Sequence, residues 1–149
     1  RIHNTTTEDW ERSFRINVLG AVNGIKAAVG VMRPQRSGSI VLTASVSGLT
    51  AWSHSAPYCA TKAAVRALTE GLRMELHSQN IRCTMISPGA IATELSESSS
   101  DEATRRNLRE FMKMAIPASA IARAIAYAIE QPANVEIDEI VIRPTAQDF

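Results

Sequence analysis

A tyrosine and a lysine stand four positions apart in the segment Tyr58-Cys59-Ala60-Thr61-Lys62. On a helix, residues with this spacing share one face. A free phenol has a pKa of about 10, which is too high for efficient proton transfer at neutral pH, and a cation within reach would lower that pKa. The pair is therefore a candidate general acid and base that moves a proton onto or off an alcohol oxygen. By itself, the spacing is also typical of a solvated helix face.

Two further features would place polar groups beside this pair. Ser45 ends the apolar run at residues 39–44, and its hydroxyl could converge on the same point. A second run, residues 81–86, ends in Pro88-Gly89, where the missing side chain would let the backbone approach a flat ring. Because doubly wound folds bind ligands at the carboxyl ends of parallel strands, we expect these groups on one rim of a sheet.

The elements that must position these residues alternate between helix and strand. Apolar residues at helical spacing predict helices at residues 7–32, 57–79 and 117–131, the first capped by Thr7. Short β-branched runs predict strands at residues 39–44, 81–86 and 137–142. Strands separated by long helices pair in parallel through right-handed crossovers. The polar residues 94–114 predict a mobile loop with a short amphipathic helix.

The predicted sheet is too thin to stand as a complete domain. Its first strand would have a bare edge, and parallel sheets need neighbours and cover on both faces. The glycine-rich turn that cradles a pyrophosphate in Rossmann-type folds does not occur in these 149 residues. The sequence therefore predicts an α/β doubly wound parallel sheet, Rossmann-like, of which residues 1–149 form only the second, C-terminal catalytic half. The N-terminal nucleotide-binding half is expected to be absent from this chain.

With these motifs in order, the chain resembles the short-chain dehydrogenase/reductase family from near its first residue to its last. The likeness is carried by Asn17-Val18-Leu19-Gly20, Ala44-Ser45-Val46-Ser47-Gly48, Tyr58-x3-Lys62 and Pro88-Gly89-x3-Thr93. The C-terminal run at residues 138–145 has a looser resemblance to a subgroup that includes NADP-dependent 3-hydroxy acid dehydrogenases.

The resemblance implies a catalytic set of four residues. Tyr58 would exchange the proton with the substrate oxygen, and Lys62 would lower the pKa of Tyr58 and bond the nicotinamide ribose. Ser45 would donate to the substrate carbonyl and orient it. Asn17 would hold a water that links Lys62 to solvent. The implied activity is NAD(P)-dependent interconversion of a carbonyl and a secondary alcohol by hydride transfer.

The resemblance also implies a cofactor set and a cofactor. Ile91, through its backbone, and Thr93, through its hydroxyl, would hold the carboxamide of the nicotinamide, and Pro88 and Gly89 would line its site beside Tyr58 and Lys62. The cofactor is expected to be NADP or NAD, with NADP favoured. Because hydride passes directly between cofactor and substrate carbon, no metal is needed.

The composition limits the kinds of partner that this chain is expected to bind. With 16 Lys and Arg against 15 Asp and Glu, the net charge of +1 gives no electrostatic case for nucleic acid or an anionic membrane. No apolar run approaches the ~20 residues of a membrane span. Two cysteines and a polar start without a signal-peptide pattern predict a cytoplasmic protein. The family likeness adds a small-molecule carbonyl or alcohol substrate and a homodimer or homotetramer that pairs the helices around Val18 and Leu68.

Two other readings compete with this one. The chain could be a non-catalytic, truncated relative that acts as an oligomerisation or binding module. Hydrolysis through Ser45 and His54 is disfavoured, because no acid is placed to orient His54 and there is no GxSxG elbow. His54 and Trp52 would wall the pocket or lie in an exposed loop. Ile121, Ile125 and Ile129 are predicted as core or subunit interface.

Overall fold

The computed structural model describes residues 2–93 and 102–148 and is built on a three-stranded parallel sheet. The strand order is β1 (Gly38–Thr43), β2 (Ile81–Pro88) and β5 (Glu139–Ile142), so the predicted parallel pairing is confirmed. As expected, β1 lies at an edge of the sheet. The predicted end of β2 was wrong: the strand continues through Ser87 and Pro88, which pair with β5.

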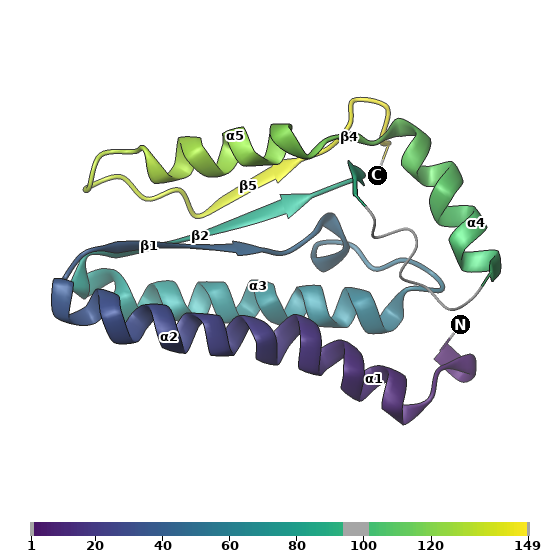
Figure 1. The fold of residues 1–149 in the computed structure, drawn as a ribbon, viewed down its shortest axis with the longest axis horizontal. Coiled ribbons are helices and arrows are strands. Elements are labelled where there is room, and N and C mark those ends of the chain that lie inside the picture. Colours follow the sequence, from purple (N-terminus) through teal and green to yellow (C-terminus); the bar gives the residue numbers. More distant parts are fainter. Residues whose placement is uncertain (1, 94–101, 149) are drawn as a thin grey trace.

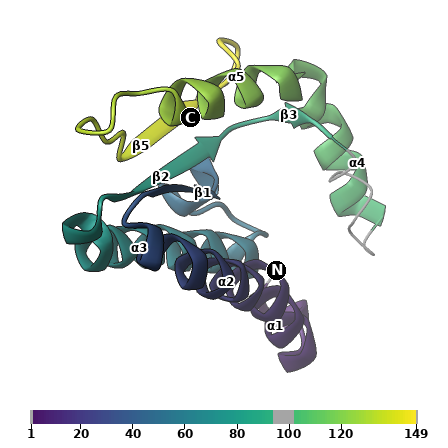
Figure 2. The same cartoon turned by 60° about the vertical axis from the view of Figure 1, so that its left-hand side comes forward.

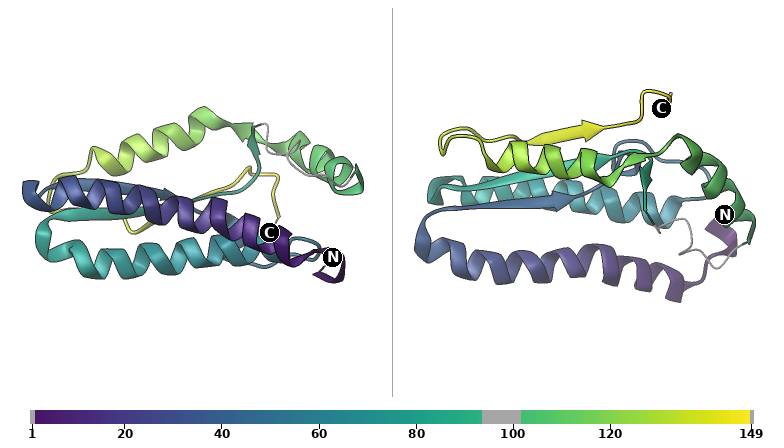
Figure 3. Two further views of the ribbon diagram at one scale, coloured as in Figure 1. Left: turned by 60° about the horizontal axis from the view of Figure 1, so that its bottom comes forward. Right: turned by 45° about the horizontal axis from the view of Figure 1, so that its top comes forward.

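Helices cover both faces of this sheet. Figure 1 shows α2 (Gly20–Gln35) and α3 (Ala56–Leu76) on one face and α5 (Ala118–Ile129) on the other, and Figure 3 gives the same layers from two more sides. Between β1, β2 and the first pair of helices lies an apolar core of Ile25, Ile40, Leu72, Leu76, Ile81 and Cys83. Three layers of this kind are typical of a doubly wound α/β fold.

The first predicted helix is interrupted. It consists of α1 (Thr7–Phe14), one π-helical stretch (Arg15–Leu19) and α2, which ends three residues later than expected at Gln35. The cap is Thr6, not Thr7: its side chain accepts from the Asp9 amide while the Asp9 carboxylate accepts from the Thr6 amide. π-Helical turns of this kind often mark functional positions, and here the turn contains Asn17.

The segment after β2 leaves the main sheet. A two-residue strand, β3 (Ile91–Ala92), pairs in parallel with β4 (Ile116–Pro117), and neither was predicted because two residues carry no periodicity. Between them lies the expected amphipathic helix, α4 (Glu102–Phe111), which Figure 2 shows projecting away from the sheet. The rest of the predicted loop, residues 94–101, lies outside the described residues. Short 3₁₀ turns complete the chain at Ile2–Asn4, Val46–Gly48, His77–Gln79 and Met112–Met114.

One arginine fixes the end of α5 to the sheet. The guanidinium of Arg82 on β2 donates to the carbonyls of Ile129 at 2.8 Å, Gln131 at 3.0 Å and Val135 at 3.2 Å. The first carbonyl belongs to the last residue of α5 and the other two follow the helix, and a cation at this end complements the helix dipole. Within the described residues, no helix combines the length and apolar character that a membrane span requires.

Candidate active site

Ser45 stands immediately after β1, at the carboxyl edge of the sheet. It caps the short 3₁₀ turn Val46–Gly48, and its Oγ accepts from the Ser47 amide at 3.1 Å. The same hydroxyl donates to the Pro88 carbonyl at 3.4 Å, across to the end of β2. The predicted meeting of Ser45 with the Pro88-Gly89 segment therefore exists in the structure. Its side chain is buried, so these contacts fix its direction.

Tyr58 and Lys62 lie in the first two turns of α3, one turn apart as their spacing predicts. The Lys62 Nζ lies 5.7 Å from the centre of the Tyr58 ring and donates to the Thr43 carbonyl at 3.0 Å. Thr43 is the last residue of β1. The lysine thus ties the helix to the strand end that precedes Ser45, and the phenol and the amine face the same rim of the sheet.

The electrostatics of the pair differ from the prediction. Burial, the largest cause, raises the pKa of Tyr58 above its ordinary value of 10.0; a hydrogen bond with Ser45 lowers it and the nearby Cys59 raises it further. Burial also lowers the pKa of Lys62 below 10.5. The expected lowering of the Tyr58 pKa by Lys62 is therefore not seen in the described structure. The physical reason is desolvation, which disfavours both charged forms and outweighs an amine whose hydrogen bond goes to Thr43.

Asn17 contacts the helix that carries the pair. Its Nδ2 donates to the Thr61 Oγ1 at 3.1 Å, and that hydroxyl donates in turn to the Tyr58 carbonyl at 2.7 Å. Thr61 is 0% exposed. The sequence predicts no role for it, because a threonine between Tyr58 and Lys62 forms no distinguishing pattern. The π-helical turn at Asn17 brings the amide to α3, so Asn17 is not a solvent-facing helix residue.

The serine loop and α3 are held together by close backbone packing at Gly48. A Cβ at this position would lie 2.8 Å from the carbonyl oxygen of Lys62 and 3.3 Å from the amide nitrogen of Ala63. Backbone atoms of a helix cannot move aside as the end of a side chain can. Gly48 therefore sets the distance between the loop that presents Ser45 and the helix that presents Lys62.

A cavity of about 500 Å³ brings the predicted groups together. Every predicted catalytic or cofactor residue lines it: Asn17, Ser45, Tyr58, Lys62, Pro88, Gly89, Ile91 and Thr93. Its remaining lining is mainly apolar and comes from Thr43, Ala44, Met112, Ala118, Ile121, Ala122 and Ile125. A volume of this size with few converging polar groups is typical of small-molecule and cofactor sites.

The apolar wall adds a role that the sequence does not predict. Ile121 is buried in the core, as predicted, but Ile121 and Ile125 of α5 also line the cavity, whereas Ile129 is exposed. Their four-residue spacing cannot distinguish a cavity wall from a core. Trp52 and His54 are not among the lining residues: the Trp52 Nε1 donates to the Ser47 Oγ at 3.0 Å, and His54 is exposed with a φ of 68°.

The space left by the missing side chain of Gly89 is filled by other residues of this chain. A Cβ there would run into the side-chain oxygen of Gln147 and lie 3.3 Å from the Cα of Arg143. The sequence instead predicts that this space admits a flat ring. Gly89 still lines the cavity with its backbone, but its Cα hydrogen faces the C-terminal segment, which returns over the end of β2.

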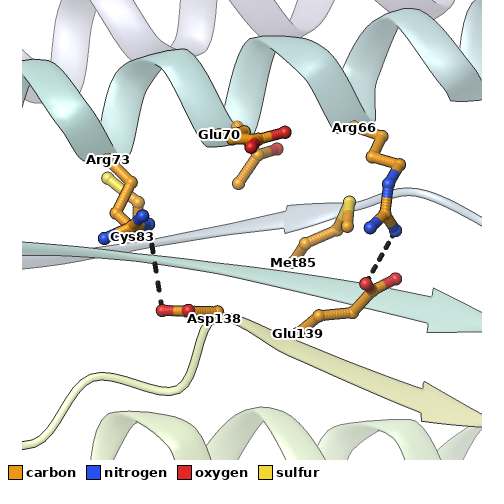
Figure 4. Close-up of a pocket in the computed structure, with 8 residues that line it drawn as sticks. Arg66, Glu70, Arg73, Cys83, Met85, Asp138 and Glu139 are labelled. Atoms are coloured by element: carbon orange, nitrogen blue, oxygen red, sulfur yellow. Dashed lines mark hydrogen bonds and ion pairs between the residues drawn. The ribbon is translucent and has the colours of Figure 1, made fainter.

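A second, smaller cavity lies on the α3 side of the sheet. Its volume is about 170 Å³, and Figure 4 shows charged side chains of α3 facing Asp138 and Glu139, at the start of β5, with Cys83 and Met85 of β2 between. It contains none of the predicted site residues. No group of three or more His, Cys, Asp or Glu suited to a metal ion occurs in the parts of the chain that the structure describes.

Comparison with known proteins agrees with this geometry. The family model described as short chain dehydrogenase matches residues 1–104. An uncharacterized oxidoreductase of Staphylococcus saprophyticus is 45% identical over 144 residues, and one of Listeria monocytogenes is 43% identical over 145; each alignment covers 95% of this chain and 58% of the relative. The chain therefore spans less than two thirds of the length of the curated relatives that it matches.

Solved structures with the same fold extend the comparison. Serine dehydrogenase from Escherichia coli superimposes with a TM-score of 0.82 at 26% identity, covering 99% of this chain and 59% of that one. The closed form of serine dehydrogenase complexed with NADP⁺ superimposes with a TM-score of 0.90 at 27% identity, covering 99% and 60%. Sheet order, site geometry and family match together identify the chain as a member of the short-chain dehydrogenase family.

The residues present fit a nicotinamide group. The lining of the cavity includes Lys62 with its amine, Thr93 with its hydroxyl, Ile91, and apolar side chains from α5. An amide-bearing flat ring needs this combination of a few polar partners and an apolar wall. The adenine half of such a cofactor has no counterpart among the described cavity residues.

Proposed function

We propose that the complete protein carrying this chain is an NADP-dependent oxidoreductase that interconverts a carbonyl and a secondary alcohol. The observation that supports this most directly is that Ser45, Tyr58 and Lys62 line one cavity together with the Pro88-Gly89 segment. A hydroxyl, a phenol and an amine in one buried pocket suit proton transfer to an oxygen of the substrate. They carry no feature of a hydrolase, since no acid orients a histidine here.

In this proposal Tyr58 is the general acid for reduction and the general base for oxidation. Its raised pKa keeps the phenol protonated at neutral pH, so the O–H can donate to a carbonyl oxygen as negative charge develops there. Ser45, whose hydroxyl lowers the pKa of Tyr58, would donate to the same oxygen, which orients it. Lys62, bonded to the Thr43 carbonyl, stays close enough to stabilise a phenolate when the reaction produces one.

The second half of the proposal concerns the cofactor. The nicotinamide would supply or accept the hydride. The backbone of Ile91 and the hydroxyl of Thr93 would hold its carboxamide, Pro88 and Gly89 would form one side of its site, and Lys62 would bond the ribose. We favour NADP over NAD because serine dehydrogenase, which has the same fold at 27% identity, is complexed with NADP⁺.

The domain organisation, location and oligomeric state expected from the sequence are also part of this proposal. We infer that residues 1–149 are the catalytic, C-terminal part of one Rossmann-type domain, without its N-terminal nucleotide-binding part. We also infer a cytoplasmic homodimer or homotetramer. Exposed apolar side chains at Ile16, Leu19 and Val31, along the first helices, are consistent with a face that another subunit covers, and they would equally serve a non-catalytic oligomerisation module.

Turnover by the complete protein tests this proposal. Carbonyl compounds are screened with NADPH and NADH, and the Tyr58→Phe variant is then compared with wild type on an active substrate. We expect Tyr58→Phe to remove nearly all turnover while it leaves NADPH binding largely intact. Wild-type turnover in that variant would exclude the mechanism, and a wild-type protein that binds NADPH without turnover would favour the non-catalytic module.

A further inference from the structure

Two successive amides after the end of β2 are bonded, the first by the last residue of β5 and the second by Gln147 in the segment that follows β5. The Gly89 amide donates to the Ile142 carbonyl at 2.7 Å, and the Ala90 amide donates to the side-chain oxygen of Gln147 at 3.0 Å. Gln147 is only 7% exposed, although it stands near the end of the chain. A side chain 57 positions away in sequence therefore completes the hydrogen bonding of the segment that leaves β2.

The fit between this glutamine and the segment is tight. Any side chain at Gly89 would occupy the place of the Gln147 amide oxygen. The carbonyl of Ala90, on the other side of the same residue, accepts from the Ile116 amide of β4 at 3.1 Å. Both backbone groups of Ala90 are thus fixed, one by Gln147 and one by β4, and Ile91 follows directly.

The other half of the Gln147 amide is unsatisfied. Its Nε2 is buried and has no hydrogen-bond partner among the described residues. A buried N–H without a partner costs free energy, and an apolar side chain of similar length would avoid that cost. Stability alone does not favour glutamine at this position, so its useful feature here is the oxygen that accepts from Ala90.

We propose that Gln147 is a positioning residue for the cofactor-binding segment at residues 88–93. It holds the peptide between Gly89 and Ile91, and so sets where the Ile91 backbone and the Thr93 hydroxyl meet a nicotinamide carboxamide. The inference rests on the proposed function for the role of Ile91 and Thr93. The contact itself, Gln147 to Ala90, stands without it.

The variant Gln147→Met tests the proposal in the complete protein, because methionine fills a similar volume without an acceptor. We expect the Kd for NADPH, measured by fluorescence, to rise roughly tenfold, the loss of about one hydrogen bond. Amide exchange at Ala90 is expected to accelerate by about the same factor. The thermal midpoint should move little, because the unpaired amide of Ala90 replaces the unpaired Nε2 of Gln147.

A matched control is Gln131→Met. The Gln131 Nε2 donates to the Tyr127 carbonyl at 2.8 Å, and neither residue lines the cavity, so the Kd and the exchange at Ala90 should both stay at wild-type values. Gln147→Glu keeps an acceptor oxygen and serves if the methionine variant does not fold. It is expected to retain slow exchange at Ala90, and fast exchange in that variant would overturn the proposal.

The outcomes separate the two proposals. Unchanged Kd and unchanged Ala90 exchange in Gln147→Met would overturn the role of Gln147, and so would a large fall in thermal midpoint with wild-type Kd, which marks a purely structural residue. If the wild-type protein binds neither NADPH nor NADH, the proposed function fails. In that case the cofactor part of this inference fails with it, while exchange at Ala90 decides whether Gln147 holds the segment.

Discussion

Glu139 and Ser87 share a hydrogen bond of 2.8 Å between the carboxylate Oε1 and the buried hydroxyl, one residue before Pro88. The other carboxylate oxygen, Oε2, accepts from the Arg66 guanidinium of α3 at 2.7 Å, the pair that Figure 4 shows beside the smaller cavity. One side chain of β5 therefore connects the helix that carries Tyr58 to the strand that leads into the cavity wall.

The two bonds of Glu139 should differ in their contribution to stability. Arg66→Ala removes an ion pair whose side chains are 40% and 21% exposed, so we expect a loss of only ~0.2–1 kcal/mol. Glu139→Ala also leaves the hydroxyl of Ser87, which is 1% exposed, without this acceptor, and should cost about 1–3 kcal/mol more. Urea unfolding measures both. Equal losses of unfolding free energy in the two variants would show that the hydrogen bond of Ser87 contributes nothing to stability.

Replacing Gly48, beside α3, and Gly71, inside it, with alanine should change the stability of the protein in opposite directions. Gly48→Ala places a Cβ against the backbone of Lys62, and overpacking of this kind costs ~1–3 kcal/mol. Gly71→Ala, inside α3, meets no atom within 4 Å and should stabilise the protein by ~0.5–1 kcal/mol through helix propensity. Thermal unfolding of both variants checks this. If Gly48→Ala is as stable as wild type, the close approach between the serine loop and α3 is wrong.

The raised pKa of Tyr58 predicts how reduction and oxidation depend on pH. The pKa lies above 10.0, so the phenol remains protonated from about pH 7 to pH 9. Carbonyl reduction uses the protonated form and should stay nearly constant over that range, whereas alcohol oxidation uses the phenolate and should increase with pH. Initial rates in both directions with the same substrate pair give the two profiles. A reduction rate that falls across the range would mean that the pKa in the working enzyme is lowered.

The thiol of Cys83 should be unreactive in the folded protein. Burial, followed by the charge of Glu136, raises its pKa from 9.0 to about 11, while Arg73 lowers it slightly. Alkylation at about pH 8.5 should therefore be slow until the chain is unfolded. Because the folded pKa is raised, this thiol adds stability below pH 9 that is lost as the pH rises through about 11. Mass spectrometry after timed alkylation measures the first effect, and rapid native labelling of Cys83 would contradict it.

The sequence by itself determined the order of the elements and the rim on which the site lies. Apolar runs and helical spacing are local signals, so β1, α3 and α5 were predicted nearly to their ends. Parallel strands then force the residues that follow them, Ser45 and Pro88, to the same edge of the sheet. The spacing from Tyr58 to Lys62 by itself predicts that both lie on one face of α3.

Only the tertiary structure decided what surrounds those residues. Burial reversed the expected direction of the Tyr58 pKa, because desolvation depends on every element packed around the phenol. The contacts of Gln147 with Ala90 and of Glu139 with Ser87 join positions more than 50 residues apart, and no local pattern marks them. The spacing of residues in the sequence determines which side chains share a face of one helix or strand. Packing sets which groups from other elements contact these side chains. The contacts of Thr61, Gly48 and Gln147 are therefore seen only in the folded chain.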